Sequence, residues 1–166
     1  MTGSFFAALG YKLYVKAGTT ASAIPAASSG MTRVLSLDNS GIQAQSDTVD
    51  VLDYDSSQGF KASLITGQSY SIQCSMNLST KDPGYLLLKA AALNAATGAT
   101  VQWYRETPVT DGSGNNPEVH KGVAQVGSFS EDIQAGNVAK VSFDLIGYGA
   151  YTFVAQAAVA QAAGGA

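Results

Sequence analysis

The sequence predicts a mainly β fold, an antiparallel β-sandwich or open barrel with one flanking α-helix. Apolar and polar residues alternate from Val138 to Ile146, from Val119 to Ser130 and from Tyr70 to Leu78, as in strands with one buried face. A single helical segment, at about residues 82–96, lies between these runs. An open β fold leaves strand edges that need covering partners, so the pattern favours a role in assembly over a catalytic role.

The composition limits the class of protein. A chain of 166 residues suits one domain, and its 13% of charged residues is low for a monomer kept in solution by surface charge. The net charge of -3 argues against tight binding to nucleic acid, which depends on clustered Lys and Arg. The single cysteine, Cys74, excludes an internal disulfide and a cysteine-rich zinc site.

No segment predicts export or a membrane partner. The first ten residues contain Phe5 and Phe6 but lack the basic leading region and the long apolar core of a secretory signal. No run of about 18 consecutive apolar residues occurs, so a transmembrane helix is not expected.

The elements are expected within one domain, residues 11–153, between an extended N-terminal arm, residues 1–10, and a flexible Ala-rich tail, residues 154–166. Strands are expected at residues 11–17, 31–37, 48–52, 60–65, 70–78, 101–106, 119–130 and 138–146. Asp38–Gly41 and Gly67 are expected to turn the chain, because such residues favour tight turns.

The strand at 70–78 has the clearest division into two faces. One face is apolar and is expected to join the core, whereas the other is polar and uncharged. The apolar face consists of Tyr70, Ile72, Cys74, Met76 and Leu78, and the polar face of Ser71, Gln73, Ser75 and Asn77.

The helix has recognisable boundaries. Asp82 is expected to be its N-cap and Pro83 its first residue, where the missing N–H of proline costs nothing. An apolar and Ala-rich run follows as far as Gly98, which is expected to stop the helix.

Catalytic and metal-binding patterns are weak, so the protein is not expected to be an enzyme or to hold a cofactor. His120 is the only histidine, and no serine nearby has the sequence of a nucleophile elbow. Asp53, Asp55 and Ser57 have the spacing of the first calcium ligands in an EF-hand, but Leu64 stands where that loop needs a bidentate glutamate.

The order of elements, together with the runs Gly122–Ser130 and Val138–Gly149, resembles the tail tube (major tail) proteins of long-tailed bacteriophages. The resemblance implies a structural virion protein that polymerises as stacked, hexameric rings. The resulting tail tube would carry genomic DNA during ejection without binding it tightly. The implied partners are further copies of the chain, the tape-measure protein, the tail terminator and baseplate proteins. The implied location is the phage tail, and the host cytoplasm during assembly.

The resemblance also implies an interface between subunits or rings. A segment from Val34 to Phe60 holds no Lys or Arg, and its acidic part resembles the long inter-strand loop of the family. The apolar N-terminal arm is expected to dock on a neighbour. The interface residues are then Phe5, Phe6, Leu9, Asp47, Asp50, Asp53, Asp55, Phe60 and Lys61.

The polar face of the 70–78 strand has two interpretations. Ser71, Gln73, Ser75 and Asn77 would face the lumen of a tube, or they would lie on an ordinary outer surface, since alternation does not identify the solvent.

The sequence leaves open three alternatives to a tail tube protein. One is a carbohydrate- or protein-binding module of a phage fibre or cell surface, with Tyr104, Tyr148 and Tyr151 as a stacking platform. The second is a tail-terminator or baseplate relative that forms one ring without stacking. The third is a hydrolase that uses His120, for which the sequence offers no catalytic partners.

Overall fold

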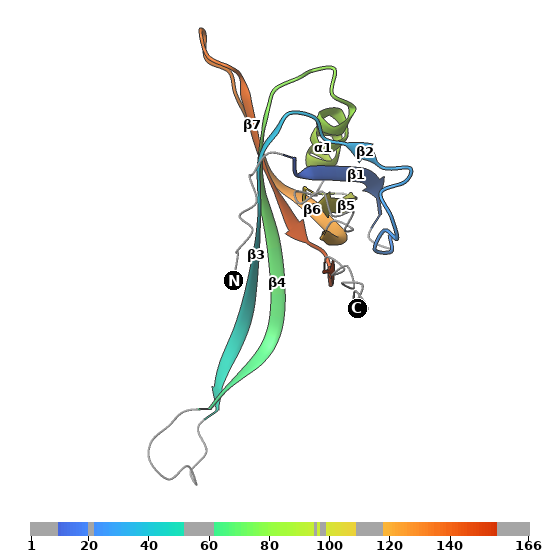
Figure 1. Ribbon diagram of the computed structural model, residues 1–166. Helices are drawn as coiled ribbons and strands as arrows, with labels where there is room; N and C mark the ends of the chain where they lie inside the picture. Colours follow the sequence, from blue (N-terminus) through green and yellow to red (C-terminus); the bar gives the residue numbers. More distant parts are fainter. Residues whose placement is uncertain are drawn as a thin grey trace, which may run out of the picture.

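Eight antiparallel strands and one helix make up the described part of the chain (Figure 1). The computed structural model describes residues 10–19, 22–51, 62–94, 96, 99–108 and 118–155. The strands form one continuous sheet in the order β2-β1-β5-β6-β7-β4-β3, with β8 paired to β6. The elements are β1 (Lys12–Gly18), β2 (Thr32–Arg33), β3 (Leu37–Val51), β4 (Ala62–Asn77), α1 (Pro83–Leu93), β5 (Thr100–Glu106), β6 (Val119–Asp132), β7 (Lys140–Gly147) and β8 (Thr152–Val154).

The sheet curls around one hydrophobic core. Tyr70 of β4 and Trp103 of β5 are separated by two strands in the sheet order, yet their ring centroids are 5.8 Å apart. The Tyr70 hydroxyl donates to the carbonyl of Val123 in β6 and accepts a hydrogen bond from Trp103 Nε1. Phe143 of β7 and Leu88 of α1 are fully buried in the same core. The predicted mainly β, antiparallel fold with one helix is confirmed.

The helix begins as predicted and ends earlier. Asp82 is the N-cap, with its Oδ1 accepting from Gly84 N at 2.8 Å, and Pro83 is the first helical residue. The helix stops at Leu93, three residues before the expected end, because Asn94 caps it: the backbone N–H and side-chain amide of Asn94 both donate to Ala90 O. The predicted stop at Gly98 lies outside the described residues.

The segment that links β1 to β3 differs from the prediction. Only Thr32 and Arg33 of the expected 31–37 strand form β2 and pair with β1. Val34 N still donates to Leu13 O of β1, but Leu35 N donates to Asp82 Oδ2, so the segment leaves the sheet there. Ser36 has a left-handed backbone, with φ 56°, and redirects the chain into β3. The turn expected at Asp38–Gly41 is wrong: these residues lie in β3, on the edge of the sheet, where Asp38 and Asn39 are exposed.

Gly67 does not turn the chain either, because β4 runs without interruption from Ala62 to Asn77. Asp47 of β3 pairs with Gly67, but the next residue, Thr48, pairs with Ile65. One extra residue is therefore inserted in β4, which is a β-bulge. A side chain at Gly67 would meet Asp47 Oδ2 at 3.2 Å, so the glycine allows the two strands to approach closely at this point.

The closing strands follow the predictions with shifted ends. β6 continues to Asp132, and its pairing with β7 shifts register between Val126 and Phe129. The strand expected at 138–146 occupies Lys140–Gly147. β8 pairs with the start of β6 and ends at Val154, one residue beyond the expected end of the domain.

Candidate functional site

The β3–β4 hairpin extends far beyond the core (Figure 1). β3 and β4 pair from Leu37–Met76 to Val51–Ala62, whereas β7 pairs with β4 only over Ser71–Asn77. Beyond Ser71 the hairpin is therefore a two-stranded ribbon. We name its outer part, residues 47–51 and 62–67, the distal hairpin. An isolated ribbon of two strands is marginally stable in water, so this part gains most from contact with another surface.

The distal hairpin exposes apolar side chains on both of its faces. Val49, Leu64 and Ile65 are 54%, 59% and 62% exposed. Val49 pairs with Leu64, so these two side chains share one face. Thr48 lies an even number of residues from the core-facing Ile42, and its partner Ile65 therefore lies on the opposite face from Val49. The bulge at Gly67 shifts the register of β4 by one residue, so that Ile65 and not Leu64 lies on the face that continues from the core.

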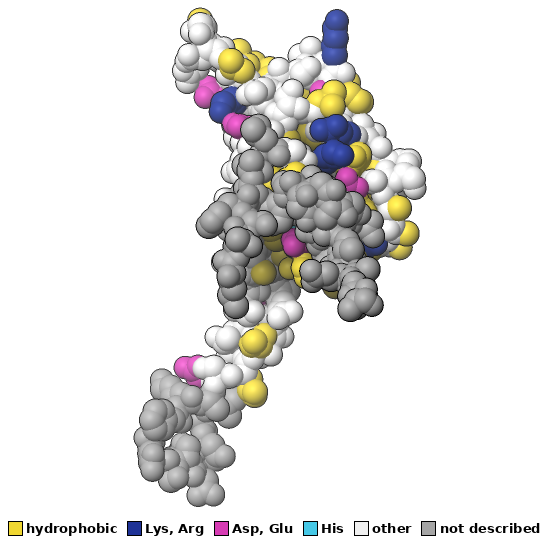
Figure 2. All heavy atoms as spheres, viewed as in Figure 1, with side chains coloured by type: hydrophobic (Ala, Val, Ile, Leu, Met, Phe, Trp, Pro, Cys, Tyr) yellow, Lys and Arg dark blue, Asp and Glu magenta, His cyan; other side chains and the backbone are white. Residues whose placement is uncertain are grey.

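The distal hairpin is also acidic and lacks described basic residues. Asp47 and Asp50 are exposed on β3, and Asp50 Oδ1 accepts from Ser63 Oγ at 2.7 Å. Figure 2 shows hydrophobic and acidic side chains on this extension, with Lys and Arg on the body of the molecule. The structure thus brings two of the predicted interface residues together. The others, Phe5, Phe6, Leu9, Asp53, Asp55, Phe60 and Lys61, lie outside the described residues.

The polar face of β4 lies where alternation predicted it, opposite the buried Tyr70, Ile72, Cys74 and Met76. Its cross-strand neighbours in β7 are Ile146, Asp144, Ser142 and Lys140. Ser128 Oγ donates to Asp144 Oδ2 at 2.7 Å, and Lys140 Nζ lies 2.9 Å from Asp38 Oδ2. Lys140 is the only basic residue in the sequence of β3, β4 and β7. The predicted set Ser71, Gln73, Ser75 and Asn77 therefore lies on a polar surface whose one cation is neutralised.

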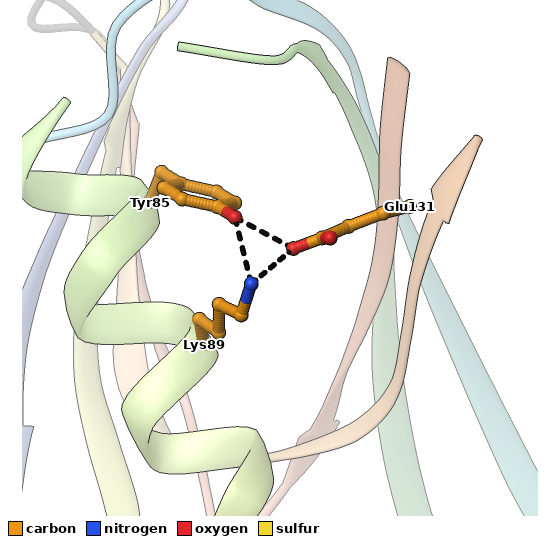
Figure 3. A network of polar contacts seen from close by, with 3 residues as sticks. All are labelled: Tyr85, Lys89 and Glu131. Atoms are coloured by element: carbon orange, nitrogen blue, oxygen red, sulfur yellow. Dashed lines mark hydrogen bonds and ion pairs between the residues drawn. The ribbon is translucent and has the colours of Figure 1, made fainter. Parts of the chain in front are cut away.

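A second polar network joins α1 to the sheet (Figure 3). Glu131 Oε1 accepts from Lys89 Nζ at 2.7 Å and from the Tyr85 hydroxyl at 2.6 Å, and Lys89 Nζ lies 3.1 Å from the same hydroxyl. The hydrogen bond from Lys89 lowers the pKa of Glu131, and the hydrogen bond to Glu131 raises the pKa of Lys89. The network borders a groove of about 380 Å³ between α1 and β6, and its hydrogen bonds link the helix to the sheet.

His120 and Cys74, the sequence's one histidine and one cysteine, make local contacts in the described part of the chain. His120 Nε2 lies 2.8 Å from Glu118 Oε1, and the His120 ring packs against Phe153 at 4.9 Å between centroids. Burial raises the pKa of the Cys74 thiol to about 12, so the thiol is neutral at pH 7. Among the described residues, no group of three or more His, Cys, Asp or Glu could hold a metal ion. In that same part, no helix is long and apolar enough to cross a membrane.

The proposed tyrosine platform is not a single surface. Tyr151 packs against Tyr70, with 4.9 Å between ring centroids, at one end of the core. Tyr104 packs edge-on against Tyr14 of β1, on the opposite side of β5 from the buried Trp103. Tyr148 is 45% exposed beyond the end of β7.

Arg105 is not among the candidates chosen from the sequence, although the alternation of its strand indicates an unusual position for a charged residue. Val101 and Trp103 point into the core, so the alternation of β5 places Arg105 on the same inward face. A charged residue at an inward position requires a compensating partner. The Arg105 guanidinium lies over the Tyr11 ring, 4.8 Å from its centroid, and lines a cavity of about 470 Å³ at the base of the hairpin.

No protein-family model and no curated protein sequence matches the chain. Solved structures do match. A chain of the SPP1 tail tube is 13% identical, with a TM-score of 0.66 over 89% of this chain and 78% of that one. A chain of the anti-feeding prophage baseplate is 9% identical, with a TM-score of 0.64 over 92% and 97%. A chain from the tail of an empty gene transfer agent particle, solved with C6 symmetry, is 19% identical, with a TM-score of 0.60 over 86% and 96%. This chain therefore has the tail-tube fold, as its sequence resemblance predicted.

Proposed function

We propose that this protein is a structural virion protein that polymerises as stacked, hexameric rings into the tube of a phage tail. The observation that carries the proposal is the distal hairpin, a two-stranded ribbon with exposed Val49, Leu64 and Ile65. Exposed apolar side chains on a projecting ribbon are stabilised when another subunit covers them. The likeness to chains from assembled tails, one of them with C6 symmetry, supports a ring of six.

The proposal extends to the lumen of the tube. In a ring, the polar face of β4 with its neighbours in β3 and β7 would form the inner wall, and Ser71, Gln73, Ser75 and Asn77 would line it. DNA passes most easily along a wall without free cations, because Lys and Arg bind phosphate by releasing counterions. The pairing of Lys140 with Asp38 leaves this face without such a cation among its described residues. The proposed role is therefore a conduit for genome ejection, not a DNA-binding site.

The proposal includes the partners and the location that the resemblance to tail tube proteins implies. The main partner is a further copy of the chain, and the tape-measure, terminator and baseplate proteins would contact the completed tube. The N-terminal arm, with Phe5, Phe6 and Leu9, would dock on a neighbouring subunit. Assembly in the host cytoplasm and residence in the virion tail follow from this role.

Electron microscopy of the purified, untagged protein over a concentration series tests the proposal. Hollow tubes or stacked rings of uniform width are the expected result. Persistent monomers at high concentration, with or without added preformed tube fragments, would contradict it. The double substitution Phe5→Ser with Phe6→Ser should weaken the stacking of rings and leave the monomer folded, which circular dichroism checks.

A ring that does not stack is the second candidate. The observation behind it is the likeness to a chain of the anti-feeding prophage baseplate, with a TM-score of 0.64. Single rings at every concentration would support this candidate over the tube.

A further inference from the structure

The cavity at the base of the hairpin contains a cation without an ionic partner. The cavity is lined by Gly10, Tyr11, Leu37, Asp38, Ser40 and Arg105, among others. Arg105 makes no ion pair with any residue that the structure describes, and its buried Nε has no hydrogen-bond partner. Burial lowers the pKa of Arg105. An arginine that is partly removed from water without a carboxylate is destabilising unless a partner supplies one.

The nearby carboxylates of the same copy are engaged elsewhere. Asp38 lines the cavity, but its Oδ2 lies 2.9 Å from Lys140 Nζ. Glu118 is close enough to affect Arg105 electrostatically, but its Oε1 lies 2.8 Å from His120 Nε2. The planar guanidinium of Arg105 therefore retains donors for an additional carboxylate.

The distal hairpin carries suitable carboxylates, but it cannot deliver them within one copy. Asp47 is exposed, and its carboxylate has no hydrogen-bond or ionic partner in the described part of the chain. Asp38 and Asp47 are nine residues apart in β3, which corresponds to roughly 30 Å of extended strand. The carboxylate of Asp47 reaches an Arg105 cavity only in another copy.

We propose that Arg105 of one copy binds a carboxylate of the distal hairpin of a neighbouring copy, Asp47 or Asp50, which enters the cavity beside Tyr11. The contact rests on the proposed function, because it requires self-assembly. It joins two features of a single copy, the Arg105 cation without an ionic partner and the exposed Asp47 carboxylate on an apolar ribbon. A bidentate pair of arginine and carboxylate also fixes the orientation of the ribbon, so the contact sets the register between subunits.

The test is a mutant cycle on the critical concentration for assembly. The variants are Arg105→Gln, the pair Asp47→Asn with Asp50→Asn, and the combination of all three. Loss of a charge-assisted contact should raise the critical concentration about 10- to 100-fold for each of the first two. The critical concentration of the combined variant should not exceed the higher of the first two values, because all three variants remove the same contact. Arg33→Gln, at an exposed arginine of β2, is the matched control and should assemble normally.

The outcomes separate the two proposals. If the wild type does not assemble, the proposed function is wrong. If the wild type assembles and Arg105→Gln has the same critical concentration, or if the effects of the two sets add fully, only the Arg105 contact is wrong.

A cross-linking measurement does not depend on the folding of Arg105→Gln. Asn39 is exposed and lines the cavity, and Gln45 is exposed on the same face of β3 as Asp47. Copies with Asn39→Cys are therefore mixed with copies with Gln45→Cys, which keep the Asp47 carboxylate, and are oxidised after assembly. A disulfide requires Cα atoms within about 7 Å, and the native Cys74 is too buried to compete. A linked dimer in the mixture is expected, and its absence in assembled material would overturn the contact.

Discussion

The two ends of β4 have opposite environments, although they belong to one strand. At the body end, Ile72 and Met76 are fully buried in the hydrophobic core. At the hairpin end, Leu64 and Ile65 are more than half exposed. The body is held by contacts within the chain, whereas the hairpin is apolar without an internal partner. We therefore expect the stability of the monomer and the proposed assembly to depend on different halves of the same strand, so that substitutions affect them separately.

A truncation in the body should have the largest effect on stability. Phe143 is fully buried, and Phe143→Ala should lower the free energy of unfolding by about 3–5 kcal/mol through lost burial and a new cavity. Denaturant unfolding of the monomer measures this change. Leu64→Ala in the hairpin should change the same quantity by less than about 0.5 kcal/mol. Similar losses at the two positions would remove the distinction between the two regions.

The N-cap of α1, Asp82, connects the helix to the segment that leads into β3, and its substitution tests how much this connection stabilises the body. Asp82 is buried and accepts from Gly84 N and from Leu35 N, both at 2.8 Å. Asp82→Ala should cost about 2 kcal/mol of unfolding free energy, because it removes an N-cap and leaves Leu35 N without its acceptor. Thermal and denaturant unfolding provide the measurement, with the exposed Asp132→Ala as control. Equal stability of the two variants would contradict this role.

Polar substitutions in the distal hairpin should act on assembly alone. Val49→Ser with Leu64→Ser should change the unfolding free energy of the monomer by less than about 0.5 kcal/mol, since both side chains are exposed. The critical concentration should rise at least about 10-fold, because burial of such side chains is worth about 1.5–3 kcal/mol each. Sedimentation across a concentration series measures it. Leu93→Ser, at an exposed leucine of α1, is the matched control, and an equal effect there would show that the hairpin is not special.

The smallest effect should come from the Glu131 network on the body. The folded state lowers the pKa of Glu131, so the stabilisation is present above the ordinary glutamate pKa and is lost as the pH falls through the lowered value. The melting temperature of Glu131→Gln should be below that of the wild type at pH 7, and the difference should shrink in acid. A difference that grows in acid would contradict this assignment. Lys89→Met should reproduce the effect by removing the partner.

The sequence predicted the body better than the hairpin, for a physical reason. The alternation of Ile72, Cys74 and Met76 is imposed by burial on one face, and the Asp82–Pro83 pair has a local role that does not depend on context. Edge and ribbon residues have no such constraint. The composition of Asp38–Gly41 therefore predicts a turn, but these residues lie in β3. Gly67 likewise predicts a turn, but it lies beside a β-bulge.

The candidate sites were only partly accessible from sequence. The polar face of β4 followed from alternation alone, and Asp47 and Asp50 were identified because their segment lacks basic residues. Arg105 required the structure, since its lack of an ionic partner depends on Lys140 and His120 pairing with the nearby carboxylates. Which cation pairs with a given carboxylate depends on the tertiary structure, and the order of residues in the sequence does not contain that information.

The apolar side chains on both faces of the distal hairpin have a kinetic consequence. One neighbour covers either the face with Val49 and Leu64 or the face with Ile65. A dimer therefore leaves the other face of the ribbon exposed. Only a larger closed assembly places surfaces on both sides. Growth should therefore begin from a rare nucleus and show a lag that shortens steeply with concentration. Fragments of preformed assemblies should abolish that lag, because they present the second surface from the start.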